Sequence, residues 1–186
     1  MNPLNLSKLE MVDHIVTPKD FQETTLASSA MCIFTDFKRV QPLVIDSNTK
    51  ATDAQLLMEK AHVRLKLVIS EKKRIIGLLS SLDISERQII RRIASGDKRE
   101  DLLVTDLMQP RELLFALDYS ELCNATVKQL LDTLQSNGLS HCLVVDHVNH
   151  QIRGLISTSD IAKQLRIPLY IDKPLTFANI FSVIHG

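Results

Sequence analysis

Two short polar motifs contain the residues of this sequence that are best suited to bind a ligand. Ser80 and Asp83 stand three positions apart, and Ser157 and Asp160 have the same spacing. A hydroxyl and a carboxylate at this spacing can cap a helix by satisfying its free backbone N–H groups. The same two groups can hydrogen-bond the hydroxyl and anionic groups of a ligand. Capping and binding are compatible, so both interpretations stay open.

The position of the motifs in the chain makes them more specific than their spacing alone. The same spacing occurs twice within the first 20 residues, where nothing else marks a site. In contrast, residues 77–84, which contain the first motif, read against residues 154–161 at an offset of 77 residues. Both motifs therefore follow a glycine-containing apolar run, at the same point of an internal repeat.

Two further segments extend this repeat. Residues 51–57 (ATDAQLL) read against 125–131 (ATVKQLL) at an offset of 74 residues. A fainter echo, Thr35-Asp36-Phe37 against Thr105-Asp106-Leu107, opens each copy. The change of offset predicts three additional residues between the helix and the motif of the second copy.

Each copy is predicted to fold as β-α-β-β-α. Thr52 and Thr126 are placed to cap the first helices, and apolar runs on either side of a polar turn predict hairpins. Since one small sheet cannot bury both its own face and its helices, we expect two units to close one core around an approximate two-fold axis. The predicted strands and second helices are 43–45, 67–69, 75–79 and 84–94 in the first copy, and 113–117, 143–145, 152–156 and 161–165 in the second.

The chain is thereby divided into five segments. They are an N-terminal extension (1–34), the first repeat (35–95), a polar linker (96–104), the second repeat (105–166) and a C-terminal tail (167–186). The fold class predicted is α+β, with α/β-like repeats and short helical extensions at both ends. In the tail, the spacing of Phe177, Ile180, Phe181 and Ile184 predicts an amphipathic helix over residues 176–184.

Paired units that end their third strand in Gly-h-h-[Ser/Thr]-x-x-Asp resemble the tandem CBS domains, of the cystathionine β-synthase type, that form a Bateman module. The resemblance covers about residues 36–166. It implies a non-catalytic regulatory module of the energy-sensing kind, whose clefts bind AMP, ADP, ATP or S-adenosylmethionine. It also implies a homodimer that signals to a regulated protein, with no cofactor besides the regulatory nucleotide.

The resemblance further implies a role for individual residues. A carboxylate can hold both hydroxyls of a ribose, and hydroxyl donors suit phosphate oxygens. Three consecutive hydroxyls precede Asp160, which favours the second site over the first. The expected ligands of the ribose are Asp160 and Asp83, those of the phosphate are Ser157, Thr158, Ser80 and Ser81, and the adenine pocket is expected at Leu43, Val44, Ile45, Leu113, Leu114 and Phe115.

Composition excludes several other classes of protein. The 22 Lys and Arg are balanced by 22 Asp and Glu, which argues against a nucleic-acid or membrane-surface binder. The chain has no outward-targeting signal and no apolar run of ~20 residues, so we expect no membrane partner. The three cysteines share no metal-like spacing, and a reduced, cytoplasmic compartment is expected.

Other candidate sites have simpler interpretations. His147 and His150 fall in a predicted turn and are expected to be exposed, so no metal site is predicted. The basic run over residues 87–99 is interpreted as the solvated face of a helix whose buried face holds Ile89, Ile90 and Ile93. No catalytic motif is recognisable, so no catalytic residue is assigned.

Two alternatives to nucleotide sensing stay open. One is a structural dimerisation or protein-interaction module with empty clefts, and the other is a small enzyme that processes adenosine nucleotides. The homodimer is also expected because the first helices carry more apolar residues than one core needs. These residues are Leu56, Leu57, Met58, Leu130, Leu131 and Leu134.

Overall fold

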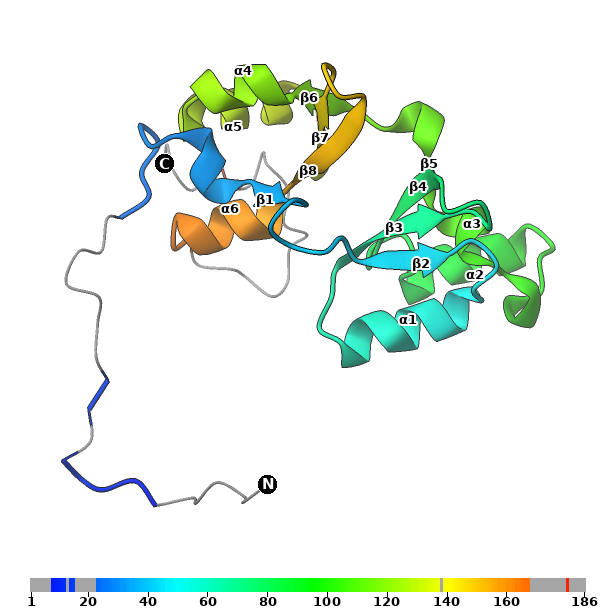
Figure 1. Cartoon of the computed structure of the whole chain (residues 1–186). Helices are drawn as coiled ribbons and strands as arrows, with labels where there is room; N and C mark the ends of the chain where they lie inside the picture. Colours follow the sequence, from blue (N-terminus) through cyan, green and yellow to red (C-terminus); the bar gives the residue numbers. More distant parts are fainter. Residues whose placement is uncertain (1–7, 13, 16–22, 138, 168–179, 181–186) are drawn as a thin grey trace, which may run out of the picture.

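The computed structural model describes residues 8–12, 14–15, 23–137, 139–167 and 180. This part of the chain contains two four-stranded sheets and six α-helices. The two sheets belong to two lobes, which Figure 1 shows at the lower right and the upper left. The predicted α+β fold with two repeats is confirmed. Within the described residues, every helix is too short or too polar to cross a membrane.

The first repeat has the predicted order of elements. It consists of β2 (Val44–Asp46), α1 (Ala51–Lys60), β3 (Leu65–Ile69), β4 (Ile75–Ser80) and α2 (Glu86–Ala94). Strand β2 is parallel to β3, and β3 is antiparallel to β4. The last three residues of β3 and the last four of β4 are buried, which explains why these runs are continuously apolar rather than alternating.

The second repeat has the same order and pairing, with one additional helix. It consists of β6 (Ala116–Asp118), α4 (Tyr119–Asn124), α5 (Val127–Ser136), β7 (His141–Asp146), β8 (Gln151–Ser157) and α6 (Thr158–Gln164). Helix α4, which the sequence did not predict, is the addition. It begins where the Asp118 carboxylate accepts hydrogen bonds from the backbone N–H groups of Ser120 and Glu121.

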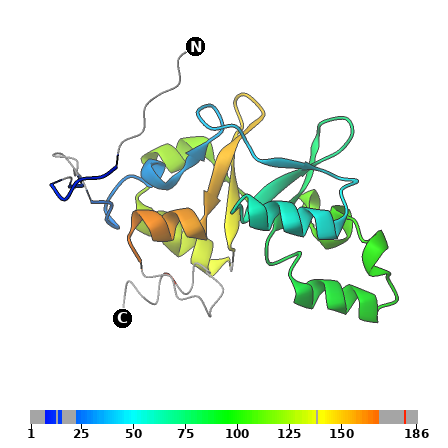
Figure 2. The ribbon, with the colours of Figure 1, turned by 90° about the horizontal axis from the view of Figure 1, so that it is seen from below.

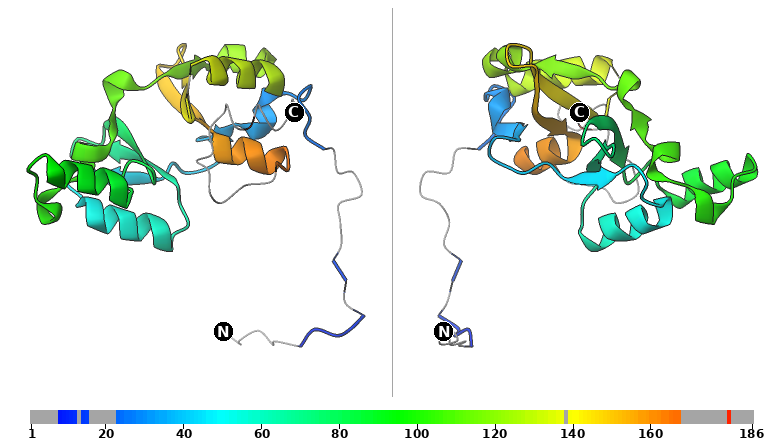
Figure 3. Two further views of the ribbon diagram at one scale, coloured as in Figure 1. Left: turned by 180° about the vertical axis from the view of Figure 1, so that it is seen from behind. Right: turned by 45° about the vertical axis from the view of Figure 1, so that its right-hand side comes forward.

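Short elements connect the two repeats. The chain crosses between the lobes once after β1 (Thr35–Asp36) and once after β5 (Gln109–Pro110), as Figure 3 shows from two sides. The remaining elements are the 3₁₀ helices η1 (Ala30–Ile33), η2 (Arg99–Asp101) and η3 (Arg111–Leu113), and helix α3 (Val104–Leu107). Thus the segment 96–104, expected to be a polar linker, contains a 3₁₀ turn.

Each sheet takes its fourth strand from the segment that precedes the other repeat. Strand β1 lies ahead of the first repeat but pairs antiparallel with β8 of the second. Strand β5 lies ahead of the second repeat but pairs with β4 of the first. The predicted echo between Thr35–Phe37 and Thr105–Leu107 is therefore wrong, because the equivalent of β1 is β5 and Thr105–Leu107 lies in α3.

These exchanged strands explain the glycine that precedes each motif. A Cβ on Gly154 would collide with the carbonyl oxygen of Thr35 and the ring of Phe34. A Cβ on Gly77 would lie 2.6 Å from the carbonyl oxygen of Gln109. Both glycines are required by the close approach of a crossing strand.

Strand register confirms that Asp83 and Asp160 are equivalent residues. In the first hairpin Leu65 pairs with Ser80, and in the second His141 pairs with Ser157. The predicted alignment of the first helices is wrong by two residues, because α1 begins at position 51 and α5 at position 127, an offset of 76. Helix α4 takes up residues in the second repeat that the sequence comparison had no means to assign.

One of the two predicted caps is correct. Thr126 Oγ1 accepts a hydrogen bond from the N–H of Gln129 at 3.3 Å, and the Gln129 side chain accepts one from the N–H of Thr126 at 2.9 Å. The prediction for Thr52 is wrong, because α1 already begins at Ala51. That end of α1 is held by the N–H of Ala51, which donates to the carbonyl of Leu102 at 2.9 Å.

Several predicted boundaries are shifted. The strand expected at 113–117 runs from Ala116 to Asp118, because Arg111–Leu113 forms a 3₁₀ turn. Helix α6 begins at Thr158, directly after β8, whereas α2 begins only at Glu86. Of the predicted tail helix, the described residues include Ile180, which is buried in the core of the second repeat; the other positions of that prediction lie outside the described residues.

The two repeats pack sheet to sheet. Leu67 and Leu78 of the first repeat form one buried cluster with Leu143 of the second, and Leu155 packs against it. Figure 2 shows the strands of both repeats in the middle of the molecule, between α6 on one side and α2 on the other. The clefts that the family resemblance implies therefore have walls from both repeats.

The predicted surplus of apolar residues on the first helices is only partly present. Met58, Leu130, Leu131 and Leu134 are buried in the cores of their own repeats. Leu56 and Leu57 are about half exposed. The predicted buried face of α2 is also wrong in part, because Ile89 is buried while Ile90 and Ile93 are exposed.

Candidate functional site

A cleft of about 680 Å³ lies between the two repeats. One wall belongs to the first repeat and supplies most of the aliphatic lining side chains, together with charged ones such as Arg64 and Glu59. The opposite edge belongs to the second repeat and carries hydroxyl, carboxylate, imidazole and ammonium groups. The aliphatic wall includes Leu43, Met58, Val63 and Leu65, and the polar edge is formed by His141, Ser157, Ser159, Asp160 and Lys163. A largely apolar cleft of this volume with a few convergent polar groups is typical of a small-molecule site.

The second polar motif lies at this polar edge. Ser157 ends β8 and is the N-cap of α6, and its Oγ accepts a hydrogen bond from the N–H of Asp160 at 3.1 Å. The same hydroxyl donates to Oδ2 of Asp160 at 2.7 Å. Capping and orientation of the carboxylate are therefore achieved together, since the hydroxyl that caps the helix also fixes the side chain of Asp160.

The first polar motif has the same internal geometry in a different backbone. Ser80 Oγ donates to Oδ2 of Asp83 at 2.6 Å, and the N–H of Ser80 donates to the same oxygen at 2.8 Å. However, a turn follows this motif, and α2 begins only at Glu86. In the first repeat the motif therefore closes a turn instead of a helix.

The structure brings four of the predicted site residues to one cleft. They are Leu43 and Ser81 of the first repeat and Ser157 and Asp160 of the second. Comparing the sequences of the two copies did not reveal that residues of both repeats line the same cleft.

The other predicted residues do not line this cleft. Ser80, Thr158 and Ile45 are buried, whereas Val44, Leu113 and Phe115 are exposed. Asp83 and Ile84 follow β4, and only Ile84 reaches the cleft. Leu114 packs against the cluster between the sheets. The expectations for Asp83 and for the segment 113–115 stay predictions.

Several lining residues were missed by sequence reasoning. Lys163 is one turn of helix after Asp160, so the i,i+3 spacing could have placed both on one face of α6. His62 lies in the left-handed region with φ 52° and ends α1, which turns the chain toward Arg64 and Leu65. The sequence contains no glycine there, and this turn was not predicted.

Charges along the cleft are of both signs. The lining includes Arg64, Lys66 and Lys163 as fixed cations, and Glu59 and Asp160 as carboxylates. Burial lowers the pKa of His141, and the negative charges of Asp83 and Asp160 oppose this shift. His141 is consequently a neutral imidazole near pH 7, able to donate one hydrogen bond and accept another.

The described residues contain no group of three or more His, Cys, Asp and Glu side chains that could hold a metal ion. His147, one of the histidines considered in the sequence, lies 3.9 Å from the Asp118 carboxylate and is exposed.

The family model of the CBS domain matches residues 34–89 and 104–167, which contain the two repeats, except the end of α2, together with β1 and β5. The chain belongs to the CBS-domain family. It is thus a tandem pair of CBS repeats, and the Asp160 cleft lies between them. A search of curated protein sequences found no match.

Solved structures with the same fold agree with this assignment. An uncharacterized conserved protein from Pyrococcus horikoshii is 21% identical, with a TM-score of 0.56, and the match covers 79% of this chain and 98% of that one. A conserved CBS-domain protein from Thermoplasma acidophilum is 21% identical, with a TM-score of 0.51 and coverage of 82% and 78%. CBSX2, crystallised in complex with AMP, is 17% identical, with a TM-score of 0.51 and coverage of 73% and 93%.

Proposed function

We propose that this CBS pair is a non-catalytic regulatory module that binds an adenosine-containing ligand in the Asp160 cleft and signals its presence to a partner protein. The observation that carries the proposal is the composition of the cleft: a carboxylate oriented by Ser157 faces an aliphatic wall supplied by the other repeat. A nucleoside has two matching parts, a flat base that suits an aliphatic surface and a ribose whose two hydroxyls suit a carboxylate.

The ribose belongs at Asp160. Its carboxylate can accept charge-assisted hydrogen bonds from the 2′ and 3′ hydroxyls. The base belongs on the aliphatic wall, between Leu43, Val63 and Leu65. The neutral imidazole of His141 and the backbone of the lining segments are available to hydrogen-bond its edge.

The phosphate belongs beside Ser159 and Lys163, on the same turn of α6 as Asp160. Arg64, from the loop before β3, lines the cleft as a further cation. In this proposal Ser157 acts by orienting the carboxylate, and Ser80 acts in the same way on Asp83. The equivalent site, with Asp83 as its ribose ligand and residues 113–115 as its base pocket, is part of the proposal as the weaker of two sites.

The AMP complex of CBSX2 supports an adenine nucleotide as the ligand, because that protein shares the fold and was crystallised with AMP. Regulation without catalysis is supported by the family model, because its two matches, residues 34–89 and 104–167, occupy most of the chain. The regulated partner is a protein that contacts the pair in a nucleotide-dependent way.

Calorimetric titration of AMP, ADP, ATP and S-adenosylmethionine into the full chain tests the proposal. Asp160→Asn should weaken binding about ten- to a hundredfold, equivalent to ~1.5–3 kcal/mol, because one charge-assisted pair of hydrogen bonds is lost. Folding stability should fall far less, since Asn is a good cap residue. Asp83→Asn should weaken binding only at the equivalent, weaker site. Asp53→Asn, an exposed carboxylate of α1 that lines neither site, is the control, and 2′-deoxy-AMP should bind more weakly than AMP.

If Asp160→Asn bound all four ligands as tightly as the wild type, the motif of Ser157 and Asp160 would have only a capping role. Absence of binding by the wild type would instead favour the second candidate, a dimerisation module with empty clefts. The specific observation in favour of that candidate is apolar surface on the first repeat: Leu57 is 53% exposed on α1, and Ile90 is 55% exposed on α2. A homodimer through these helices is compatible with both candidates.

A further inference from the structure

A second hollow, of about 480 Å³, is lined by the turns of both hairpins and by the segments that follow β1 and β5. It shares only Phe37 with the lining of the Asp160 cleft. Its cationic lining residues are Lys38, Lys73, Arg74, Arg111 and Arg153. His150 lines it too, and none of its described lining residues is Asp or Glu. A chain with equal numbers of acidic and basic residues thus gathers five fixed positive charges at one place.

Two of these cations are held in place by the fold. Both guanidinium contacts of Arg153 go to Asp36, at 2.7 and 2.8 Å. Arg111 donates to the backbone carbonyl of Ile75 at 3.1 Å, which fixes its position beside the first hairpin turn. Because the carbonyl is neutral, the charge of Arg111 stays uncompensated.

The other cations have weaker partners or none among the described side chains. Lys73 lies 3.5 Å from Asp46 in a highly exposed pair, a kind that contributes little. Lys38 lies near enough to Asp146 to lower its pKa, although hydrogen bonds from Asn149 are the larger cause of that shift. When the carboxylates of Asp36, Asp46 and Asp146 are counted against them, the five cations still have an excess of two positive charges.

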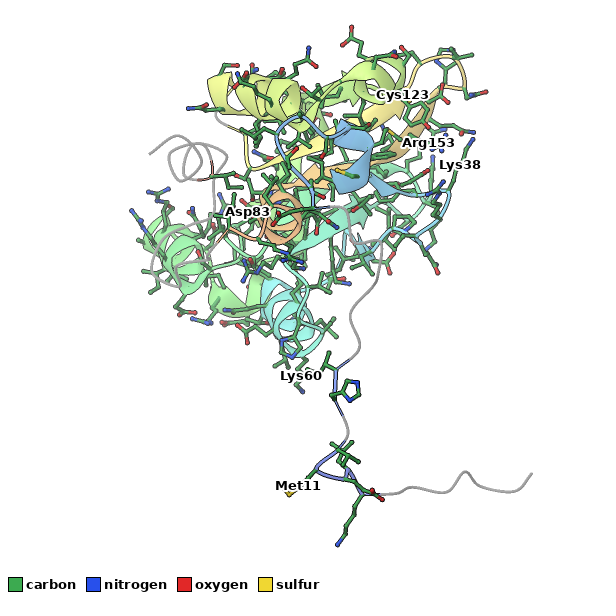
Figure 4. The ribbon with its side chains drawn as sticks, turned by 90° about the vertical axis from the view of Figure 1, so that its left-hand side faces the viewer. Met11, Lys38, Lys60, Asp83, Cys123 and Arg153 are labelled. Atoms are coloured by element: carbon green, nitrogen blue, oxygen red, sulfur yellow. The ribbon has the colours of Figure 1, made fainter. Side chains whose placement is uncertain are left out.

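Lys38 and Arg153 lie beside each other at one side of the molecule in Figure 4, and Asp83 is labelled toward the other side. The two hairpin turns bring Arg74 and His150, which are 76 positions apart in sequence, into the same hollow. Guanidinium and ammonium donors that converge from several segments are suited to a compact anion with several charged oxygens. The volume fits a small molecule.

We infer that this hollow is a binding site for a polyphosphate anion, such as inorganic triphosphate or the polyphosphate group of a nucleotide whose base lies outside it. The site is separate from the Asp160 cleft and can be occupied at the same time. Phe37 lines both, but none of the cations of the hollow lines the Asp160 cleft.

The probe is inorganic triphosphate, titrated calorimetrically into the full chain at low and at moderate salt. The double variant Lys38→Gln/Arg74→Gln removes two cations whose side chains hold no other part of the fold. It should bind triphosphate about tenfold more weakly or worse. The matched control is Lys60→Gln/Arg91→Gln, which removes two exposed charges from α1 and α2 and should bind as the wild type does.

An excess of AMP should leave triphosphate binding unchanged, and the hollow variant should keep its affinity for AMP. Triphosphate that AMP displaces, or equal losses in both double variants, would overturn the inference. The inference would also be overturned if Lys38→Gln/Arg74→Gln lost binding of a single-stranded oligonucleotide but kept binding of triphosphate. The hollow would then be a nucleic-acid surface. Failure of AMP to bind the wild type would count against the proposed function but would leave the triphosphate result to decide this site.

Discussion

The guanidinium of Arg153 and the carboxylate of Asp36 form a bidentate ion pair across 117 positions of sequence, with hydrogen bonds of 2.7 and 2.8 Å. Arg153 also lies over the ring of Tyr119, 4.5 Å from its centroid. The pair fastens β1, which precedes the first repeat, to β8 of the second. It therefore joins two segments that are far apart in sequence but neighbours in the sheet of one lobe.

This pair should make stability depend on pH in the acid range. The Arg153 hydrogen bonds lower the pKa of Asp36 from 3.8 to about 2. Because the pKa is lower in the folded state, the stabilisation is fully present above pH ~4 and is lost as the pH falls through about 2. Asp36→Asn should lower the free energy of unfolding by about 2 kcal/mol at pH 7 and by much less near pH 2.

Urea unfolding at several pH values measures this difference. Asp53→Asn, an exposed carboxylate in the first turn of α1, serves as the control and should change stability little at any pH. A constant gap between Asp36→Asn and wild type from pH 7 to pH 2 would show that the pair does not titrate as described.

Gly154→Ala should destabilise the protein by about 1–3 kcal/mol, because the new methyl group would collide with backbone as well as with a ring. The carbonyl of Thr35 cannot move without disturbing the pairing of β1 with β8. Thermal unfolding measures the loss. In Gly96→Ala nothing lies within 4 Å of the added atom, so only the strain of φ 105° remains and the cost should be about 1 kcal/mol.

Thr126→Ala should cost about 1 kcal/mol of stability, because it removes the side-chain acceptor that caps α5. Thr52→Ala makes the same chemical change one position inside α1 and should cost less than ~0.5 kcal/mol, since Ala has the higher helix propensity. Equal losses for the two variants, measured by urea unfolding, would contradict the cap assignment.

We propose that the chain forms a homodimer and that the apolar surface of α1 and α2 forms its contact. Leu57→Glu and Ile90→Glu each introduce a charge at a position that is more than half exposed in the single chain. Light scattering at micromolar concentration should show dimers for the wild type and monomers for both variants. Val148→Glu changes an apolar residue that is 89% exposed in the second hairpin turn and should remain dimeric. A monomeric wild type at this concentration would contradict the proposed homodimer.

The sequence by itself determined the repeat and its order of elements. Continuous apolar runs around a polar turn predicted both hairpins, and the match of residues 77–84 with 154–161 identified Asp83 and Asp160 as equivalent. These are local signals, because a buried hairpin and a motif at its end depend on residues close together in the chain.

Other features were settled only by tertiary contacts. The Thr52 cap was wrong because the backbone of Leu102, far along the chain, already binds the N–H of Ala51. Ile90 was predicted to be buried, but a periodic apolar face does not say which of its residues meets a neighbour. The exchange of β1 and β5 was invisible because strands of two residues carry no periodicity.

The composition of the cleft also depended on the tertiary structure. Sequence assigned Asp160 its chemistry, but the aliphatic wall opposite it comes from Leu43, Val63 and Leu65 of the other repeat. The basic hollow likewise joins Lys38, Arg74 and Arg153, none of which is adjacent to another in sequence. A sequence specifies the chemistry of each side chain, whereas the packing of the two sheets decides which of those side chains share a site.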